Sequence, residues 1–367
     1  MTCHFVYSVP YNLCQTPTER IKNKIRGVLN DMDMSVGLIS NREPSEADFT
    51  AWPIRSPFEN TKHIYSALAA RMHTRLYHLS EHVRCKFGPD DIFIGHPYFP
   101  HKEGGYGVTE LAVREIMRPK KLALISPLHC DVNIKSDHIN KDFLDDIDKL
   151  LPSADILFGI MGEYWWDQWD KSPYAHWKPK MIRLDMAVDT TRYPRIKNSF
   201  NPKGKRGYLY IGNSSDPRKG TEFLSCLMSN IVNCRVGWIG YGPDIPNVPR
   251  IAELSALSPE FMASIASEYD FFISPAVADP NPTTILESMS WGFPVVCTPQ
   301  SGYYETNYMK NIFLDDLERS IEVLTSLQYM DDFHLIQMSN TARNIVESKY
   351  TWCDLTSKII SSLDIQS

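Results

Sequence analysis

Two carboxylates and two hydroxyl residues stand around the start of a predicted helix. Asp279 lies in a proline-rich loop that follows an apolar run, and Glu287 lies about one turn into a helix expected over residues 283–291. Thr283 and Thr284 open that helix, where unpaired backbone N–H groups and a partial positive charge favour phosphate. Both carboxylates can then contact one ligand from different sides, which indicates a nucleotide-sugar site. The alternative is a helix cap followed by a solvated glutamate.

A second polar segment, residues 211–220, has the pattern of a strand end, a turn and a helix start. Gly212 and Asn213 lie in the turn, and Arg218 and Lys219 stand where the helix begins. Arginine can bind phosphate oxygens with two N–H groups, and lysine supplies a compact positive charge. The segment therefore predicts an anion site that would stabilise a departing diphosphate. A solvated basic turn is the alternative.

A histidine follows an apolar run in the first half of the chain. His129 comes directly after a strand expected at residues 122–126, and Asp131 follows as a second candidate. The carboxyl ends of parallel strands share one edge of a sheet, so His129, Lys219 and Asp279 are all expected to line one cleft. A purely structural histidine is the alternative.

Short apolar runs alternate with helical patterns along the whole chain, which is typical of parallel sheets built from βαβ units. The segment 192–206 contains proline, glycine, asparagine and basic residues without apolar periodicity, and it predicts a linker. The tail, from about residue 331 to 365, is expected to be mostly helical. Strands are expected at residues 3–8, 35–39, 92–95, 122–126, 156–160 and 181–184 before the linker, and at 207–211, 235–239, 250–254, 271–274 and 295–297 after it.

Length and composition indicate an ordinary globular protein with two domains. The chain has 367 residues, of which 43% are hydrophobic and 22% charged, and its formal charge of -6 disfavours a dedicated nucleic-acid binder. The start of the chain lacks a signal-peptide pattern, and no apolar run approaches the roughly 18 residues that span a bilayer. We therefore expect a cytoplasmic protein, with peripheral contact at the inner membrane face left open.

The cysteines and the paired aspartates do not predict a metal site. The eight cysteines show no Cys-x-x-Cys spacing and are expected to be reduced and buried. Asp31 with Asp33, and Asp146 with Asp148, have the Asp-x-Asp spacing, but neither pair follows a strand. Both pairs fit polar helix positions better than metal ligands, so no bound metal is expected.

Aromatic and basic clusters give two further candidates for acceptor or membrane contact. Residues 164–177 hold four of the eight tryptophans, among them Trp165 and Trp166. Their rings could stack on sugar or lie at a membrane interface, whereas packing at a domain edge is the alternative. Residues 71–86 are basic and are expected to form a helix that meets an anionic acceptor or a membrane, or that is simply solvated.

Several motifs together resemble one enzyme family. Asp279 and Glu287, with seven residues between them and Trp-Gly-Phe-Pro-Val-Val at 291–296, resemble the Glu-x7-Glu signature of the retaining glycosyltransferases of family 4. The Arg-Lys-Gly at 218–220, the Gly-Tyr-Gly-Pro turn at 240–243 and residues 188–193 are also similar to that family. The motifs occur in the right order from about residue 184 to 299. The N-terminal half matches mainly in layout.

The resemblance implies an α/β protein of GT-B architecture. Two Rossmann-like, doubly wound domains would face a central cleft, and a C-terminal helix would cross back. The implied boundaries are an acceptor-binding domain over residues 1–195, a donor-binding domain over 205–345, and the crossing helix over 346–367.

The resemblance also implies residue roles. Glu287 would hold the donor ribose, Arg218 and Lys219 the diphosphate, and Asp279 the hydroxyls of the donor sugar. His129 would lie near the reacting sugar, and Thr283 and Thr284 would offer backbone N–H groups. The chain departs from the family in having Asp279 for a glutamate and Asn213 for a frequent arginine, a loss for which Arg218 would compensate. The remaining predicted donor-site residues are Gly212, Asn281 and Leu254, with Asp131, Trp165 and Trp166 on the acceptor side.

The sequence thus predicts a retaining, metal-independent glycosyltransferase. It would move a sugar from a nucleotide diphosphate, with UDP or GDP expected, to an acceptor hydroxyl of a carbohydrate or lipid-linked glycan, and it needs no cofactor. A nucleotide-sugar epimerase or hydrolase on the same fold is one alternative. A catalytically degenerate nucleotide-sugar-binding protein is the other.

Overall fold

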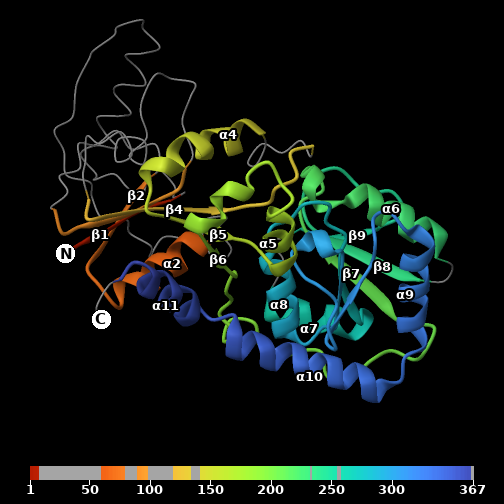
Figure 1. Cartoon of the computed structure of the whole chain (residues 1–367). Coiled ribbons are helices and arrows are strands. Elements are labelled where there is room, and N and C mark those ends of the chain that lie inside the picture. The colour runs from red at the N-terminus through yellow and green to blue at the C-terminus, as the bar shows by residue number, and fades with distance from the viewer. Residues whose placement is uncertain are drawn as a thin grey trace, which may run out of the picture.

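Two parallel sheets lie at opposite ends of the molecule (Figure 1). The computed structural model describes residues 1–7, 59–78, 89–97, 119–133, 141–231, 234–253 and 258–364. Within these residues each sheet has six strands, and every pairing between strands is parallel. The alternation of apolar runs and helical patterns in the sequence correctly predicted this architecture.

The first sheet has the strand order β2-β1-β3-β4-β5-β6. Its strands β3 and β5 are almost entirely buried, because helices cover a parallel sheet on both faces and its strands are then apolar throughout. The strands are β1 (Cys3–Tyr7), β2 (Thr74–His78), β3 (Ile92–Gly95), β4 (Lys121–Pro127), β5 (Ile156–Ile160) and β6 (Met181–Leu184), and the helical elements are α2 (Glu59–Ala69), α4 (Lys141–Leu150), η2 (Leu151–Ser153), α5 (Glu163–Trp169) and η3 (Ala175–Lys180).

The second sheet has the order β12-β11-β10-β7-β8-β9, which is the Rossmann order read from the far edge. Chain direction across the sheet therefore reverses between β7 and β10, where ligands of such sheets bind. The strands are β7 (Gly207–Ile211), β8 (Arg235–Ile239), β9 (Arg250–Ala252), β10 (Phe271–Ser274), β11 (Val295–Cys297) and β12 (Met309–Asn311), and the helical elements are η4 (Pro217–Lys219), α6 (Thr221–Asn230), α7 (Pro259–Glu268), α8 (Thr283–Trp291), η6 (Pro299–Ser301) and α9 (Leu317–Tyr329).

The tail of the chain is mostly helical, as the sequence predicted, and its two helices run back from the second sheet to the first. Helix α10 (Asp332–Lys349) packs on α8, and α11 (Trp352–Ser362) packs on α2, as Figure 1 shows. The rings of His63 and Trp352 stack with their centroids 4.9 Å apart. Arg71 donates a hydrogen bond of 2.7 Å to the hydroxyl of Ser357. Residues from the two ends of the chain thus hold the crossing helix in place.

The expected linker, residues 192–206, contains no helix or strand, yet it is anchored to the second sheet. The Lys197 ammonium is 1% exposed and donates to Asp270 at 2.8 Å. Arg206 is also buried and donates to the carbonyl of Leu327 at 2.8 Å. This segment therefore moves with the second sheet rather than as a loose tether.

Some expectations from the sequence were wrong. Residues 74–78 of the basic stretch form strand β2 instead of a helix. Thr74 and Leu76 are both buried, and their spacing of two residues suits one face of a strand. Cys226 and Cys353 are exposed instead of buried. The expected strand at 35–39 and the pair Asp31 and Asp33 lie outside the described residues.

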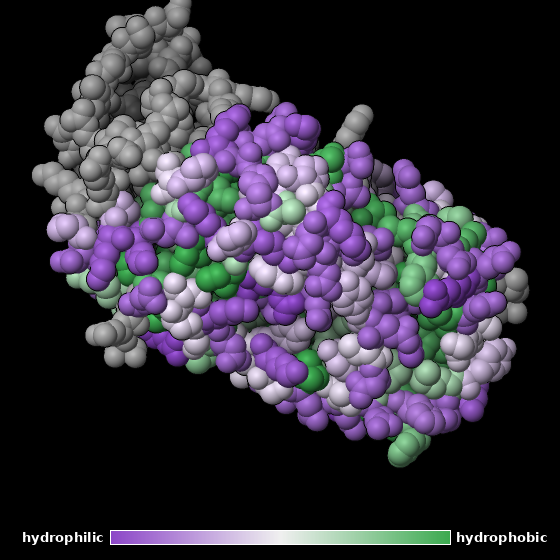
Figure 2. All heavy atoms as spheres, viewed as in Figure 1, coloured by the Kyte–Doolittle hydropathy of each residue, from purple (hydrophilic) through white to green (hydrophobic). Residues whose placement is uncertain are grey.

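The described surface gives no sign of a membrane span. No helix among the described residues combines the length and the apolar character needed to cross a bilayer. On the face drawn in Figure 2, hydrophilic side chains cover most of the described surface, and apolar side chains are scattered between them.

Candidate functional site

The loops that follow strands of the first sheet meet the loops that follow strands of the second. Gly162, just after β5, donates its backbone N–H to the carbonyl of Pro280, which follows β10, at 2.8 Å. The backbone N–H of Met186, after β6, donates to the side chain of Asn281 at 2.9 Å. The carboxyl ends of both sheets therefore face each other, which is where the sequence placed its candidate residues.

Backbone passes very close to backbone at this junction. A Cβ atom on Gly162 would lie 2.0 Å from the carbonyl oxygen of Gly302, so only glycine fits there. The indole N–H of Trp165 donates to the carbonyls of Asp279 and Gln300 at 3.1 and 3.0 Å. Trp165 is 3% exposed and packs inside the junction. Trp166 is half-buried beneath the ammonium of Lys178, 4.0 Å from its ring centroid.

His129 is buried in the same junction. Its side chain is fully inaccessible, its ring lies 5.4 Å from that of Trp165, and neither ring nitrogen has a hydrogen-bond partner among the described residues. Burial, aided by the charge of Arg218, lowers the pKa of His129 to about 4, although Asp131 and Asp279 act in the opposite direction. The imidazole is therefore neutral at neutral pH, with one ring nitrogen that can donate a hydrogen bond and one that can accept.

Acid should destabilise the protein through His129. In the unfolded chain this imidazole takes up a proton near pH 6.5, whereas in the folded protein it stays neutral down to about pH 4. The unfolded state then binds more protons than the folded state. The free energy of unfolding should therefore fall by up to about 3 kcal/mol as the pH is lowered through that range. Urea unfolding at several pH values should show this loss in the wild type and not in His129→Gln. Parallel curves would mean that the folded protein does not hold the imidazole neutral.

The two predicted phosphate-binding cations are both ion-paired in this structure. The Lys219 ammonium contacts the carboxylate of Asp279 across the loops after β7 and β10. Arg218 donates from Nε and Nη2 to the carboxylate of Asp216 at 3.1 and 2.8 Å. Asp216 also caps η4 by accepting from the backbone N–H of Arg218. Burial acts to raise the pKa of Asp216, but the hydrogen bonds and charge of Arg218 outweigh it and lower the pKa.

Asp216 lies within the candidate site, although it was not among the residues predicted from the sequence. The signal was present, since an aspartate followed by proline at the first helical position is a common helix start. Its carboxylate lies close enough to act on His129 and on the buried hydroxyl of Tyr210, whose pKa is raised mainly by burial. That hydroxyl has no hydrogen-bond partner in the part of the chain that the structure describes. Neither effect can be read from sequence spacing.

The reversal point between β7 and β10 is closed by direct backbone contact. Gly220 has φ +67° and a Cβ atom there would lie 1.9 Å from the carbonyl oxygen of Pro275. The backbone N–H of Val277 donates to the carbonyl of Arg218 at 2.8 Å. This contact fixes the distance between the segment that holds Lys219 and the loop that holds Asp279.

Helix α8 has the bounds that the sequence predicted. It begins at Thr283, and Gly292, with φ +90°, ends it. Thr283 and Thr284 are half-buried in its first turn, where backbone N–H groups have no acceptor within the helix. Glu287 accepts a hydrogen bond of 3.2 Å from the hydroxyl of Tyr193. Thr283, Thr284 and Glu287 all lie on α8, which directly follows the loop that holds Asp279.

The remaining candidates occupy turns or lie outside the described part. The Nδ2 of Asn281 is buried without a partner among the described residues. The Gly212 carbonyl accepts from Trp238 at 2.9 Å, and the side chains of Asn213 and Asp131 each cap the backbone N–H two residues on, at 2.9 Å. Leu254, expected to border the base, lies outside the described residues.

The described residues hold no cluster of three or more histidine, cysteine, aspartate or glutamate side chains that suits a metal ion. Of the Asp-x-Asp pair on α4, Asp146 contacts Lys149 at 2.9 Å, and Asp148 accepts from His176 and Trp177, each at 2.6 Å. These aspartates therefore serve contacts within the first half of the chain.

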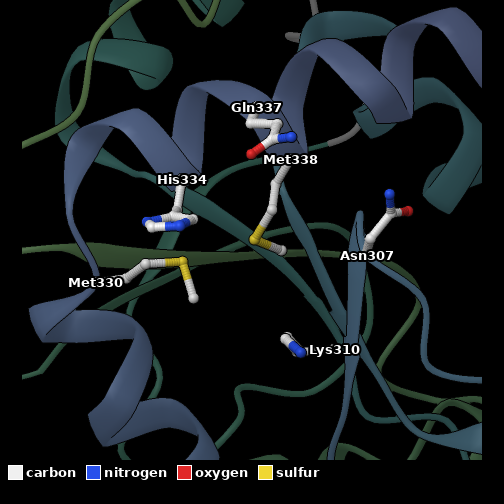
Figure 3. A pocket seen from close by; sticks show the side chains of 6 residues that line it. All are labelled: Asn307, Lys310, Met330, His334, Gln337 and Met338. Atoms are coloured by element: carbon white, nitrogen blue, oxygen red, sulfur yellow. The ribbon is translucent and has the colours of Figure 1, made fainter.

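A separate pocket of about 400 Å³ lies away from this junction, between the edge strand β12 and α10 (Figure 3). A lysine, a histidine and two methionines contribute to its wall, and none of its residues belongs to the candidate site. It is lined by Asn307, Lys310, Met330, His334, Gln337 and Met338.

Comparison with solved structures identifies the fold. No model of a known protein family matches the sequence, and no curated protein matches it in sequence. In three dimensions, however, the chain is similar to glycosyltransferase structures, and it has the GT-B fold that the sequence resemblance implied. The resemblance is thus confirmed at the level of the fold.

Three of the similar structures illustrate the match. Sucrose-phosphate synthase from Thermosynechococcus elongatus has a TM-score of 0.58 and 12% identity, and each chain is covered completely. WaaG, a glycosyltransferase involved in lipopolysaccharide biosynthesis, has a TM-score of 0.55 and 14% identity over 85% of this chain and 97% of its own. TarM has a TM-score of 0.54 and 11% identity over 76% of this chain, which spans 56% of TarM's length.

Proposed function

We propose that this chain is a retaining, metal-independent glycosyltransferase that moves a sugar from a nucleotide diphosphate, UDP or GDP, to an acceptor hydroxyl. The observation that supports it most is the meeting of His129, Arg218, Lys219 and Asp279 at the facing carboxyl ends of two parallel sheets. Two cations, a helix start and a buried neutral imidazole in one place suit a donor whose leaving group is a diphosphate.

In this proposal the second sheet binds the donor. Lys219 and Arg218 contact the diphosphate together with the first turn of α8, and Glu287 holds the ribose. Asp279 and the buried amide of Asn281 contact sugar hydroxyls. Residues 205–345 form the donor domain and residues 1–195 the acceptor domain, with Asp131 and Trp166 as candidate acceptor contacts. WaaG, which has the same fold, is involved in lipopolysaccharide biosynthesis, and the proposal therefore includes a lipid-linked or polysaccharide acceptor.

The proposed reaction needs little from the protein beyond positioning and charge. The bond between the anomeric carbon and the diphosphate oxygen lengthens, and positive charge grows on the sugar ring. Lys219, Arg218 and the α8 N–H groups stabilise the negative charge that moves to the leaving phosphate. The acceptor oxygen attacks from the same face, its proton passes to the departing phosphate, and the anomeric configuration is retained. Neutral His129 can exchange hydrogen bonds with a hydroxyl of the reacting sugar.

A nucleotide-sugar-binding protein without turnover is the second candidate. The observation in its favour is that each of the two cations already has a carboxylate partner. An anionic ligand must compete with Asp216 and Asp279 for these cations, and this competition lowers the affinity of the site for the ligand. The paired carboxylates also reduce the positive charge that can stabilise a leaving group. The two candidates differ in whether bound donor is ever cleaved.

The test is calorimetric titration with UDP, GDP and ADP in EDTA, followed by nucleotide release from the matching sugar donors with and without an acceptor panel. We expect one nucleotide to bind without metal and its sugar donor to be cleaved in an acceptor-dependent manner. NMR of the product should show the anomeric configuration of the donor. Binding without cleavage would favour the second candidate, and the absence of any binding would remove the donor site from this chain.

A further inference from the structure

The two ion pairs of the site are built differently. Arg218 and Asp216 are two residues apart, and Asp216 holds the guanidinium with two hydrogen bonds while its Oδ1 also caps the backbone of η4. Lys219 and Asp279 lie sixty residues apart along the chain and join the two loops at the reversal point of the sheet. The first pair is part of the local turn. The second pair forms only while the loops after β7 and β10 keep their present positions relative to each other.

The backbone around Asp279 is fixed, so only its side chain can change partner. Its N–H donates to the carbonyl of Gln300 at 3.0 Å, and its carbonyl accepts from Trp165 at 3.1 Å. The Asp279 side chain is 11% exposed and that of Lys219 is 27% exposed. The carboxylate is thus largely withdrawn from water, and it needs a hydrogen-bond donor at all times.

We propose that Asp279 exchanges partners when the donor binds, an inference that rests on the proposed function. In the empty site its carboxylate holds Lys219. In the occupied site Lys219 binds the diphosphate, and a hydroxyl of the donor sugar replaces the ammonium as the partner of Asp279. Arg218 contacts the diphosphate without leaving Asp216, because three hydrogen bonds tie it to that turn.

This exchange makes the site select an intact donor over its own product. A nucleoside diphosphate draws Lys219 away and leaves a largely buried carboxylate without a partner, which is costly. A nucleotide sugar supplies a hydroxyl to the same carboxylate and avoids that cost. Asp279 therefore weakens binding of the free nucleoside diphosphate, and it favours product release after transfer.

The experiment compares the affinities of UDP, GDP, UDP-glucose and GDP-mannose by calorimetry in EDTA. The wild type is compared with Asp279→Asn and with Asp170→Asn, a matched control in which the exposed Asp170 pairs with Lys178. Asp279→Asn should bind the nucleoside diphosphate about tenfold more tightly than the wild type, since no carboxylate competes for Lys219. The preference for the nucleotide sugar over the diphosphate should shrink by about the same factor. Asp170→Asn should match the wild type.

Other outcomes separate this inference from the proposed function. If the wild type binds nucleotide and Asp279→Asn binds it equally or more weakly, partner exchange is wrong while the donor site stands. If neither protein binds any of the four probes, both proposals fail. In a Lys219→Ala background, Asp279→Asn should change diphosphate affinity less than about twofold, and a larger change would also overturn the exchange. Asp279→Ser serves as a second variant, and thermal melting checks that each protein is folded.

Discussion

Replacing Lys219 with alanine should slow nucleotide release from the sugar donor by about 10²- to 10³-fold, because it removes a charge placed to stabilise the leaving diphosphate. The effect should appear mainly in kcat, since charge on the leaving phosphate grows towards the transition state. The measurement is steady-state nucleotide release with whichever of the UDP- or GDP-sugars binds. Lys219→Arg should recover part of the rate, because it restores charge without the compact geometry of an ammonium.

Lys310→Ala is the matched control for this prediction. Lys310 also pairs with a carboxylate, that of Glu305 at 2.7 Å, but it lines the pocket beside β12 rather than the junction. It should leave the rate within about twofold of the wild type. If Lys219→Ala turns over at the wild-type rate, Lys219 does not stabilise the leaving group. The contact between the loops at the reversal point would then serve the fold and not catalysis.

Much of the fold was predictable because the strands of a buried parallel sheet have continuous apolar sequences. The strands at residues 92–95, 156–160, 181–184, 207–211 and 235–239 agree with the structure residue by residue. Two of the edge strands, β12 and β2, gave a weaker signal. Strand β12 has only three residues and a half-buried lysine at its centre, and β2 was obscured by arginine and histidine side chains on either side of buried Leu76. Neither strand shows the apolar run on which the prediction depended.

The positions of the candidate residues in the fold were predictable, but their contacts were not. Spacing after strands placed His129, Lys219 and Asp279 at one edge, and the fold brings all three together. The choice of partner is a tertiary property, so the competition of Asp279 for Lys219 was hidden. The role of Trp165 was hidden for the same reason, since its two acceptors are carbonyls more than a hundred residues away.

The largest loss of stability is expected from Asp270→Ala. Asp270 is fully buried and accepts from the Lys197 ammonium at 2.8 Å, from the backbone and side-chain N–H groups of Asn201 at 2.8 and 2.9 Å, and from the Gly207 N–H at 3.0 Å. Within the described part of the chain, its removal leaves the lysine charge buried with only the Ala266 carbonyl, at 2.7 Å, as acceptor. The free energy of unfolding should fall by about 3–5 kcal/mol. Urea denaturation followed by tryptophan fluorescence measures this loss.

Two further variants show whether the loss comes from the uncompensated charge. Glu268→Ala breaks an exposed pair with Arg235 in the same half of the chain, and it should cost less than about 1 kcal/mol. Replacing both partners, as Lys197→Met with Asp270→Leu, should recover more than half of the loss, because no buried charge then lacks a partner. A double variant as unstable as Asp270→Ala would instead assign the loss to the Asn201 and Gly207 hydrogen bonds. In that case the linker would be held by its backbone, and the lysine would contribute little.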